Sequence, residues 1–187
     1  EFSPNGKLLA AGVSDGIYLW EYPYKGKEPI VLSTLGNNVN SIAFSPDSQR
    51  LAGTTSSGVI VYNVRVPEQV DASPTMLPHM WVKGVAFSPN GYLLASTGGF
   101  QSDEGHKVKV WDLRQTVPIP VILPEDRVSS ESVAFSPNGR WLASIGEKGN
   151  VLVWDVSKVT QGSGQPSPLY ELQRGVRVYS VVLSPDG

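Results

Sequence analysis

The sequence predicts an all-β protein in which short antiparallel strands come in groups of four. A Phe-Ser-Pro-Asx motif begins at each of four positions, 42, 43 and 48 residues apart, and a Leu-Ser-Pro-Asp-Gly copy follows 48 residues later. A Leu-Ala pair begins seven residues after each of the four phenylalanines, and an aromatic residue follows at 18, 18, 24 and 19 residues. Repetition at this period indicates stacked supersecondary units. The motifs begin at Phe2, Phe44, Phe87, Phe135 and Leu183.

The first strand and turn of each unit follow from local chemistry. Runs such as Ser41 to Phe44 and Ser132 to Phe135 are rich in β-branched and aromatic residues, which favour strands. The Pro-Asx-Gly sequence that follows is typical of a tight turn, because proline fixes φ at one corner and glycine accepts positive φ at another. Ser48 stands where the other complete units carry glycine, so the second turn is predicted to be somewhat different or strained.

Three further strands complete each unit. The strand that contains Leu-Ala leads through a Gly/Ser-rich corner to an alternating strand such as Val108 to Trp111 or Val151 to Trp154. A fourth apolar run ends the unit, at Pro29 to Ser33, Thr75 to Pro78, Pro118 to Leu123 and Ser167 to Leu172. Four antiparallel strands in about 45 residues form one blade of a β-propeller. The predicted blades are residues 1–34, 35–78, 79–123 and 124–172, and residues 173–187 are predicted to begin a fifth.

These motifs resemble those of the WD-repeat family, with two literal Trp-Asp pairs at Trp111-Asp112 and Trp154-Asp155. The resemblance implies a circular all-β propeller that serves as a platform for partners. The Gly-His pair and the Asp that usually mark such repeats are mostly missing. The family's hydrogen-bonded His, Ser/Thr, Asp and Trp tetrad is therefore expected to be incomplete, and apolar packing is expected to hold most blades.

The predicted architecture is an open arc of four four-stranded blades, a fragment of a larger propeller. Blade faces are buried only against neighbouring blades, so the remaining blades are expected elsewhere in a longer chain. Only Glu1 and Phe2 precede the first turn. Val176 to Leu183 has the pattern of an inner strand, and its pairing beside Leu8 to Val13 would instead close a ring of four blades.

Composition excludes several functional classes. With a net charge of −2, the chain has no overall positive field to attract nucleic acid or anionic lipid, so neither is predicted as a partner. No apolar run approaches the roughly 20 residues that cross a bilayer. The absence of cysteine excludes disulfides and thiolate metal sites. A cytoplasmic location is the expectation, and no cofactor is predicted.

Three segments contain residue types found in chemical sites, but each has an ordinary structural interpretation. Gly12 to Gly16 fits the G-x-S-x-G pattern of hydrolases, but strands rather than a strand and a helix flank Ser14. Asp103, Glu104 and His106 could hold a divalent ion, yet their spacing matches no known ion loop. Ser157 to Pro168 is predicted to be a flexible insertion. The chain is therefore predicted not to be an enzyme.

A partner is predicted to bind where loops lead into the innermost strands, because these loops gather around one mouth of a propeller. Trp81 is the preferred anchor, since an aromatic at a loop-to-strand junction suits an interface. The alternative is that Trp81 packs onto a neighbouring blade. The candidate partner-binding residues are Asn38, Asn40, His79, Trp81, Lys83, Arg127, Glu131, Arg177 and Tyr179.

Two functions remain open from the sequence. The first is a non-catalytic scaffold that binds a protein or peptide, as the repeat coverage and the resemblance imply. The second is an accessory propeller that gates or senses substrate for a hydrolase or kinase domain elsewhere in a longer chain. A hydrolase elbow or a kinase signature in the flanking sequence would favour the second.

Overall fold

The computed structural model describes residues 1–34, 37–65, 70, 73–98, 107–123, 132–145, 149–160, 167–172 and 178–184. The described residues form fifteen strands and one five-residue helix. The first sheet contains β1 (Leu8–Gly12), β2 (Gly16–Glu21) and β3 (Ile30–Ser33). The second contains β4 (Ile42–Phe44), β5 (Arg50–Thr54), β6 (Gly58–Asn63) and β7 (Thr75–Pro78).

The third sheet contains β8 (Val82–Phe87), β9 (Leu93–Gly98), β10 (Val108–Asp112) and β11 (Val121–Leu123). The fourth contains β12 (Val133–Phe135), β13 (Trp141–Ile145), β14 (Val151–Asp155) and β15 (Tyr170–Leu172). The helix α1 (Val156–Thr160) follows β14 directly. No helix in these ranges is long and apolar enough to span a membrane.

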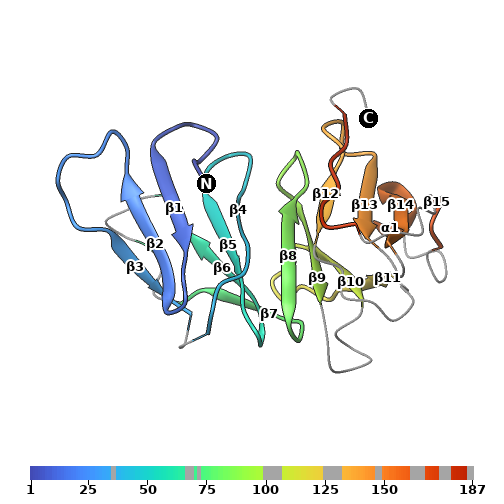
Figure 1. Ribbon diagram of the computed structural model, residues 1–187, viewed down its shortest axis with the longest axis horizontal. Coiled ribbons are helices and arrows are strands. Elements are labelled where there is room, and N and C mark those ends of the chain that lie inside the picture. Colours follow the sequence, from blue (N-terminus) through green and yellow to red (C-terminus); the bar gives the residue numbers. More distant parts are fainter. Residues whose placement is uncertain are drawn as a thin grey trace.

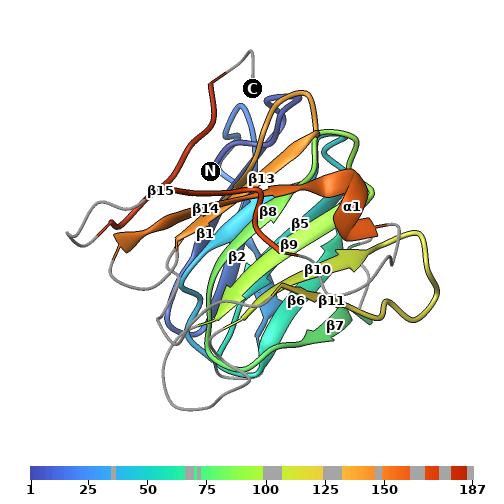
Figure 2. The same cartoon turned by 90° about the vertical axis from the view of Figure 1, so that its right-hand side faces the viewer.

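Each sheet is an antiparallel meander, and the four sheets follow one another along the molecule in chain order (Figures 1 and 2). The innermost strands β4, β8 and β12 are neighbours in space. Each sheet's last strand ends at the residue predicted from its fourth apolar run. The all-β, propeller-type architecture predicted from the repeat is therefore confirmed.

The first sheet differs from the prediction of four strands in every blade. Its innermost position is represented only by an isolated antiparallel bridge between Phe2 and Leu9. The two residues ahead of the Ser3 turn are too short a segment to form a ladder, so this sheet has three strands.

Apolar side chains fill the space between successive sheets in three clusters. The first joins sheets one and two around Ile17, Leu19 and Leu51. The second joins sheets two and three, and the third joins sheets three and four. Trp111 and Trp154 are completely buried in these two layers. Because strand side chains alternate between faces, each middle sheet supplies apolar residues to both of its neighbours.

Two predictions about the C-terminal part were wrong or only partly realised. The segment Ser157 to Pro168 was predicted to be a flexible insertion, but its first residues belong to α1, which buries Val156 and Val159 against the third core cluster.

Of the predicted inner strand Val176 to Leu183, residues 178–183 are described and form no strand. The described residues hold no fifth sheet to pair with them, and Val181 N instead donates to Ser132 Oγ at 3.3 Å. No described residue of this segment pairs with β1, so the four sheets form an open arc.

Candidate interaction surface

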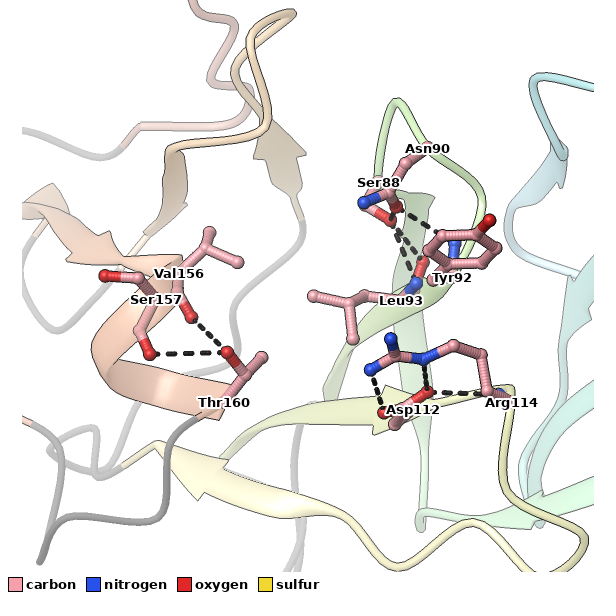
Figure 3. A network of polar contacts seen from close by, with 9 residues as sticks. All are labelled: Ser88, Asn90, Tyr92, Leu93, Asp112, Arg114, Val156, Ser157 and Thr160. Carbon is pink, nitrogen blue, oxygen red and sulfur yellow. Dashed lines mark hydrogen bonds and ion pairs between the residues drawn. The ribbon is translucent and has the colours of Figure 1, made fainter.

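The Ser-Pro-Asx turns define one side of the arc, which we call the turn face. In the third sheet, Ser88 Oγ accepts the N–H of Leu93 at 2.9 Å and donates to Asn90 Oδ1 at 2.7 Å (Figure 3). Asn90 Oδ1 also accepts the N–H of Tyr92 at 3.0 Å. The same bonds recur around Ser3, Ser45 and Ser136, all of which are buried. The motif therefore recurs because one hydroxyl and one Asx oxygen satisfy the backbone of the whole turn.

Neighbouring turns contact one another across the sheets. Arg50 Nη2 donates to Gly91 O at 2.7 Å, and the N–H of Asn5 donates to Ser48 Oγ at 3.1 Å. Gly91 and Gly139 have φ of 72° and 71°, and Ser48 adopts φ of 60° in the equivalent place. A non-glycine residue in this region carries backbone strain. Of the two outcomes predicted for the second turn, the structure therefore shows the strained one.

Carboxylates on the turn face are held by local hydrogen bonds. Hydrogen bonds from Arg114 lower the pKa of Asp112, and the Arg114 guanidinium also lies 5.3 Å from the centre of the Tyr92 ring (Figure 3). Hydrogen bonds from Ser157 likewise lower the pKa of Asp155. Acids with lowered pKa values stay ionised at neutral pH, which makes them poor proton donors for catalysis. These side chains stabilise turns.

The opposite side carries the connections that lead into β4 and β8, and we call it the loop face. Asn38 and Asn40 are exposed there, and Lys83 is partly exposed at the start of β8. Asn40 Nδ2 donates to Val82 O at 3.3 Å, which joins the loops of the second and third sheets. This bond brings Asn40 next to the start of β8, where Trp81 and Lys83 also lie.

Trp81 is the most distinctive residue of the loop face. Its φ is 55°, which is rare for a bulky side chain. Its N–H donates to Ser56 O at 2.8 Å, so the second sheet holds the strained backbone. The side chain keeps 42% of its surface exposed, and the adjacent Met80 keeps 48%. Neighbouring sheets therefore leave this aromatic accessible, and backbone strain of this kind clusters at functional sites.

His79 lies between β7 and β8 and is buried. The prediction that it contacts a partner is therefore corrected. It is 1% exposed, and its Nδ1 lies 2.8 Å from Ser96 Oγ. Ser96 Oγ also accepts the indole N–H of Trp111 at 3.0 Å. In the fourth sheet, Trp154 donates to Ser144 at 3.2 Å. The sequence signal for this buried arrangement is a serine directly after the Leu-Ala pair, as in the third and fourth sheets. Ala11 and Gly53 stand at this position in the first two sheets.

Of the remaining candidate site residues, the structure describes some and not others. Tyr179 is 63% exposed beside the fourth sheet. Ser14 lies in the hairpin corner between β1 and β2, without the strand-to-helix turn that a hydrolase nucleophile needs. The described residues contain no cluster of three metal-ligating side chains. Arg127, Glu131, Arg177, Asp103, Glu104 and His106 lie outside the described residues.

Comparison with known proteins gives matches along most of the chain. The family model "WD domain, G-beta repeat" matches residues 30–63, 73–112 and 126–155, together more than half of the sequence. The Target of rapamycin complex subunit wat1 of Schizosaccharomyces pombe is 29% identical over 188 residues, which cover 98% of this chain and 57% of that protein. WD repeat-containing protein 18 of Bos taurus is 35% identical over 81 residues, covering 42% of this chain and 18% of that protein. The chain thus spans little more than half of the yeast relative.

Proposed function

The chain belongs to the WD domain, G-beta repeat family, and we propose on that premise that it is a non-catalytic scaffold that binds a protein partner through its loop face. The observation that carries the proposal is the exposed, strained Trp81 beside Met80 at the start of β8. Tryptophan is enriched among the residues that dominate binding energy at interfaces. A rigid stack of sheets beneath it keeps the anchor in place at little cost in entropy.

The surroundings of Trp81 suit recognition of a protein surface. Asn38 and Asn40 supply amide donors and acceptors at the edge of the apolar pair, and Lys83 supplies one positive charge. An apolar centre with a polar rim is the usual anatomy of an interface. One relative is named as a subunit of a complex, and we propose that this chain likewise acts as a subunit of a multiprotein assembly.

Affinity capture with matched variants tests the proposal. The chain and its Trp81→Ala variant are immobilised, and Tyr170→Ala serves as the control because Tyr170 is a similarly exposed aromatic, at 58%, on the outer strand of the fourth sheet. We expect proteins retained by the parent chain and by Tyr170→Ala to be lost from Trp81→Ala. Circular dichroism must show equal folding of all three. Equal retention by Trp81→Ala would refute the role of the loop face.

We also propose that further sheets of the same kind cover the outer face of the first sheet in a longer chain. Leu9, Tyr18 and Trp20 form this face, and their counterparts in the fourth sheet are buried against the third. Tyr18 and Trp20 remain only partly buried here. In a longer chain we expect Trp20 to resist oxidation by N-bromosuccinimide, whereas reactivity equal to that in the 187-residue chain would contradict this.

A further inference from the structure

A cleft opens on the turn face between the first and second sheets, on the side away from Trp81. Its volume is about 690 Å³, which falls in the range of ligand-binding clefts. The first Ser-Pro-Asn-Gly turn forms one wall, the loop that follows β2 forms the second, and the second sheet forms the third. The lining residues that matter below are Lys7, Tyr22, Lys25, Ser48, Val64 and Arg65.

Three cations of the lining have no anionic partner among the described residues. Lys7, Lys25 and Arg65 are exposed, and none of them forms an ion pair in this part of the chain. The lining includes one carboxylate, Glu21, whose Oε2 pairs with Lys27 Nζ at 3.3 Å. Among the described residues, the cleft therefore carries three cations that no carboxylate pairs with, on a chain whose net charge is −2. A concave surface of one sign concentrates ligands of the opposite sign.

Buried apolar residues form the floor of the cleft, and contacts within the chain hold its walls in place. Leu8 and Val64 are 4% and 1% exposed, so they belong to the packed interior. The Tyr22 ring stays 53% exposed but packs edge-on against Phe2, with ring centres 5.2 Å apart. Ser48 joins the two walls through the bond from Asn5 N. A ligand thus meets the exposed Tyr22 ring on a packed base, with charges at the rim.

A second hollow of about 340 Å³ has Glu21 and Lys25 in common with the first. Leu19, Tyr24 and Ile30 supply apolar surface to its lining, and Lys27 and Glu28 add one charge of each sign. The two hollows together follow the edge of the first sheet. A ligand that fills both must be elongated, as an extended peptide is.

We propose that this cleft binds an extended acidic segment of a partner protein. Asp or Glu side chains of the segment pair with Lys7, Lys25 and Arg65, and an apolar side chain between them rests on the exposed ring of Tyr22. A peptide fits better than nucleic acid, because the chain as a whole has a net charge of −2, whereas nucleic-acid-binding domains are usually basic. The site is separate from the loop face and does not depend on the function proposed above.

An array of random octapeptides probed with the fluorescently labelled chain tests the proposal. We expect the bound peptides to be enriched in Asp and Glu and to dissociate as salt is raised. In the Lys7→Glu/Arg65→Glu variant we expect the acidic enrichment to disappear and the affinity for the best peptide to fall by about tenfold or more. Arg140→Glu/Lys158→Glu is the matched control, since it also reverses one arginine and one lysine, both exposed, in the turn before β13 and on α1, and it should bind like the parent chain.

Circular dichroism of each variant separates loss of binding from loss of folding. Arg65→Gln is a milder second variant, which removes one charge and should also weaken binding of acidic peptides. Absence of acidic enrichment, or enrichment that survives the double reversal, would overturn the proposal. Competition by an oligothymidylate that displaces the peptide completely would assign the cleft to nucleic acid instead and would also overturn it.

Discussion

Replacement of Ser88 by alanine tests the physical basis of the repeated motif. Ser88 is 2% exposed, and its hydroxyl accepts the Leu93 N–H at 2.9 Å while it donates to Asn90 at 2.7 Å (Figure 3). Alanine leaves a buried backbone N–H without that acceptor, which costs about 1–3 kcal/mol. We expect the free energy of unfolding of Ser88→Ala to fall by about that amount.

Urea unfolding followed by tryptophan fluorescence measures the change, and an unchanged slope shows that the folded state remains compact. Ser57→Ala is the control, because Ser57 is exposed in the β5–β6 hairpin and its loss should cost less than about 0.5 kcal/mol. If the two variants unfold at the same urea concentration, the hydroxyl does not hold the turn and the explanation of the motif fails.

Three other experiments, with four substitutions, probe separate parts of the structure. Gly139→Ala places a Cβ at φ of 71°, so we expect a loss of about 1–2 kcal/mol in the same urea experiment, and no loss would show that the turn relaxes. Ser96→Ala and Trp111→Phe remove two ends of one buried hydrogen bond, so a double-mutant cycle should show coupling, whereas additive effects would argue against the bond. For Asp112, whose folded pKa lies below the unfolded value, ionisation stabilises the fold above about pH 4, and this contribution is lost as pH falls through the folded pKa. Carboxyl NMR titration should show that pKa rising in Arg114→Gln, and an unchanged value would rule out Arg114 as its cause.

The repeat made most of the fold predictable from the sequence. Turn residues such as Pro-Asn-Gly have strong local preferences, and the alternation in Val151 to Trp154 reports which face each side chain occupies. Even the departure at Ser48 was informative, because a missing glycine implied a strained residue at that corner. These features depend on neighbours close in sequence, so they could be predicted without knowledge of tertiary contacts.

Features that depend on tertiary packing were missed. The helix α1 forms in a polar segment because Val156 and Val159 find an apolar surface between the third and fourth sheets. His79 was predicted at the surface because its loop position favoured exposure. In the structure it is buried, and its ring forms a hydrogen bond with the buried Ser96. The cationic cleft combines residues from two sheets, and no single sequence window contains Lys7, Lys25 and Arg65 together.

Amide hydrogen exchange of the chain alone and with the partner obtained by affinity capture tests the central claim most directly. If the loop face is the scaffold's binding surface, the partner will slow exchange in residues 37–41 and 79–83, where Asn38, Asn40 and Trp81 lie. Exchange unchanged in both segments, together with slowing confined to other parts of the chain, would contradict the account.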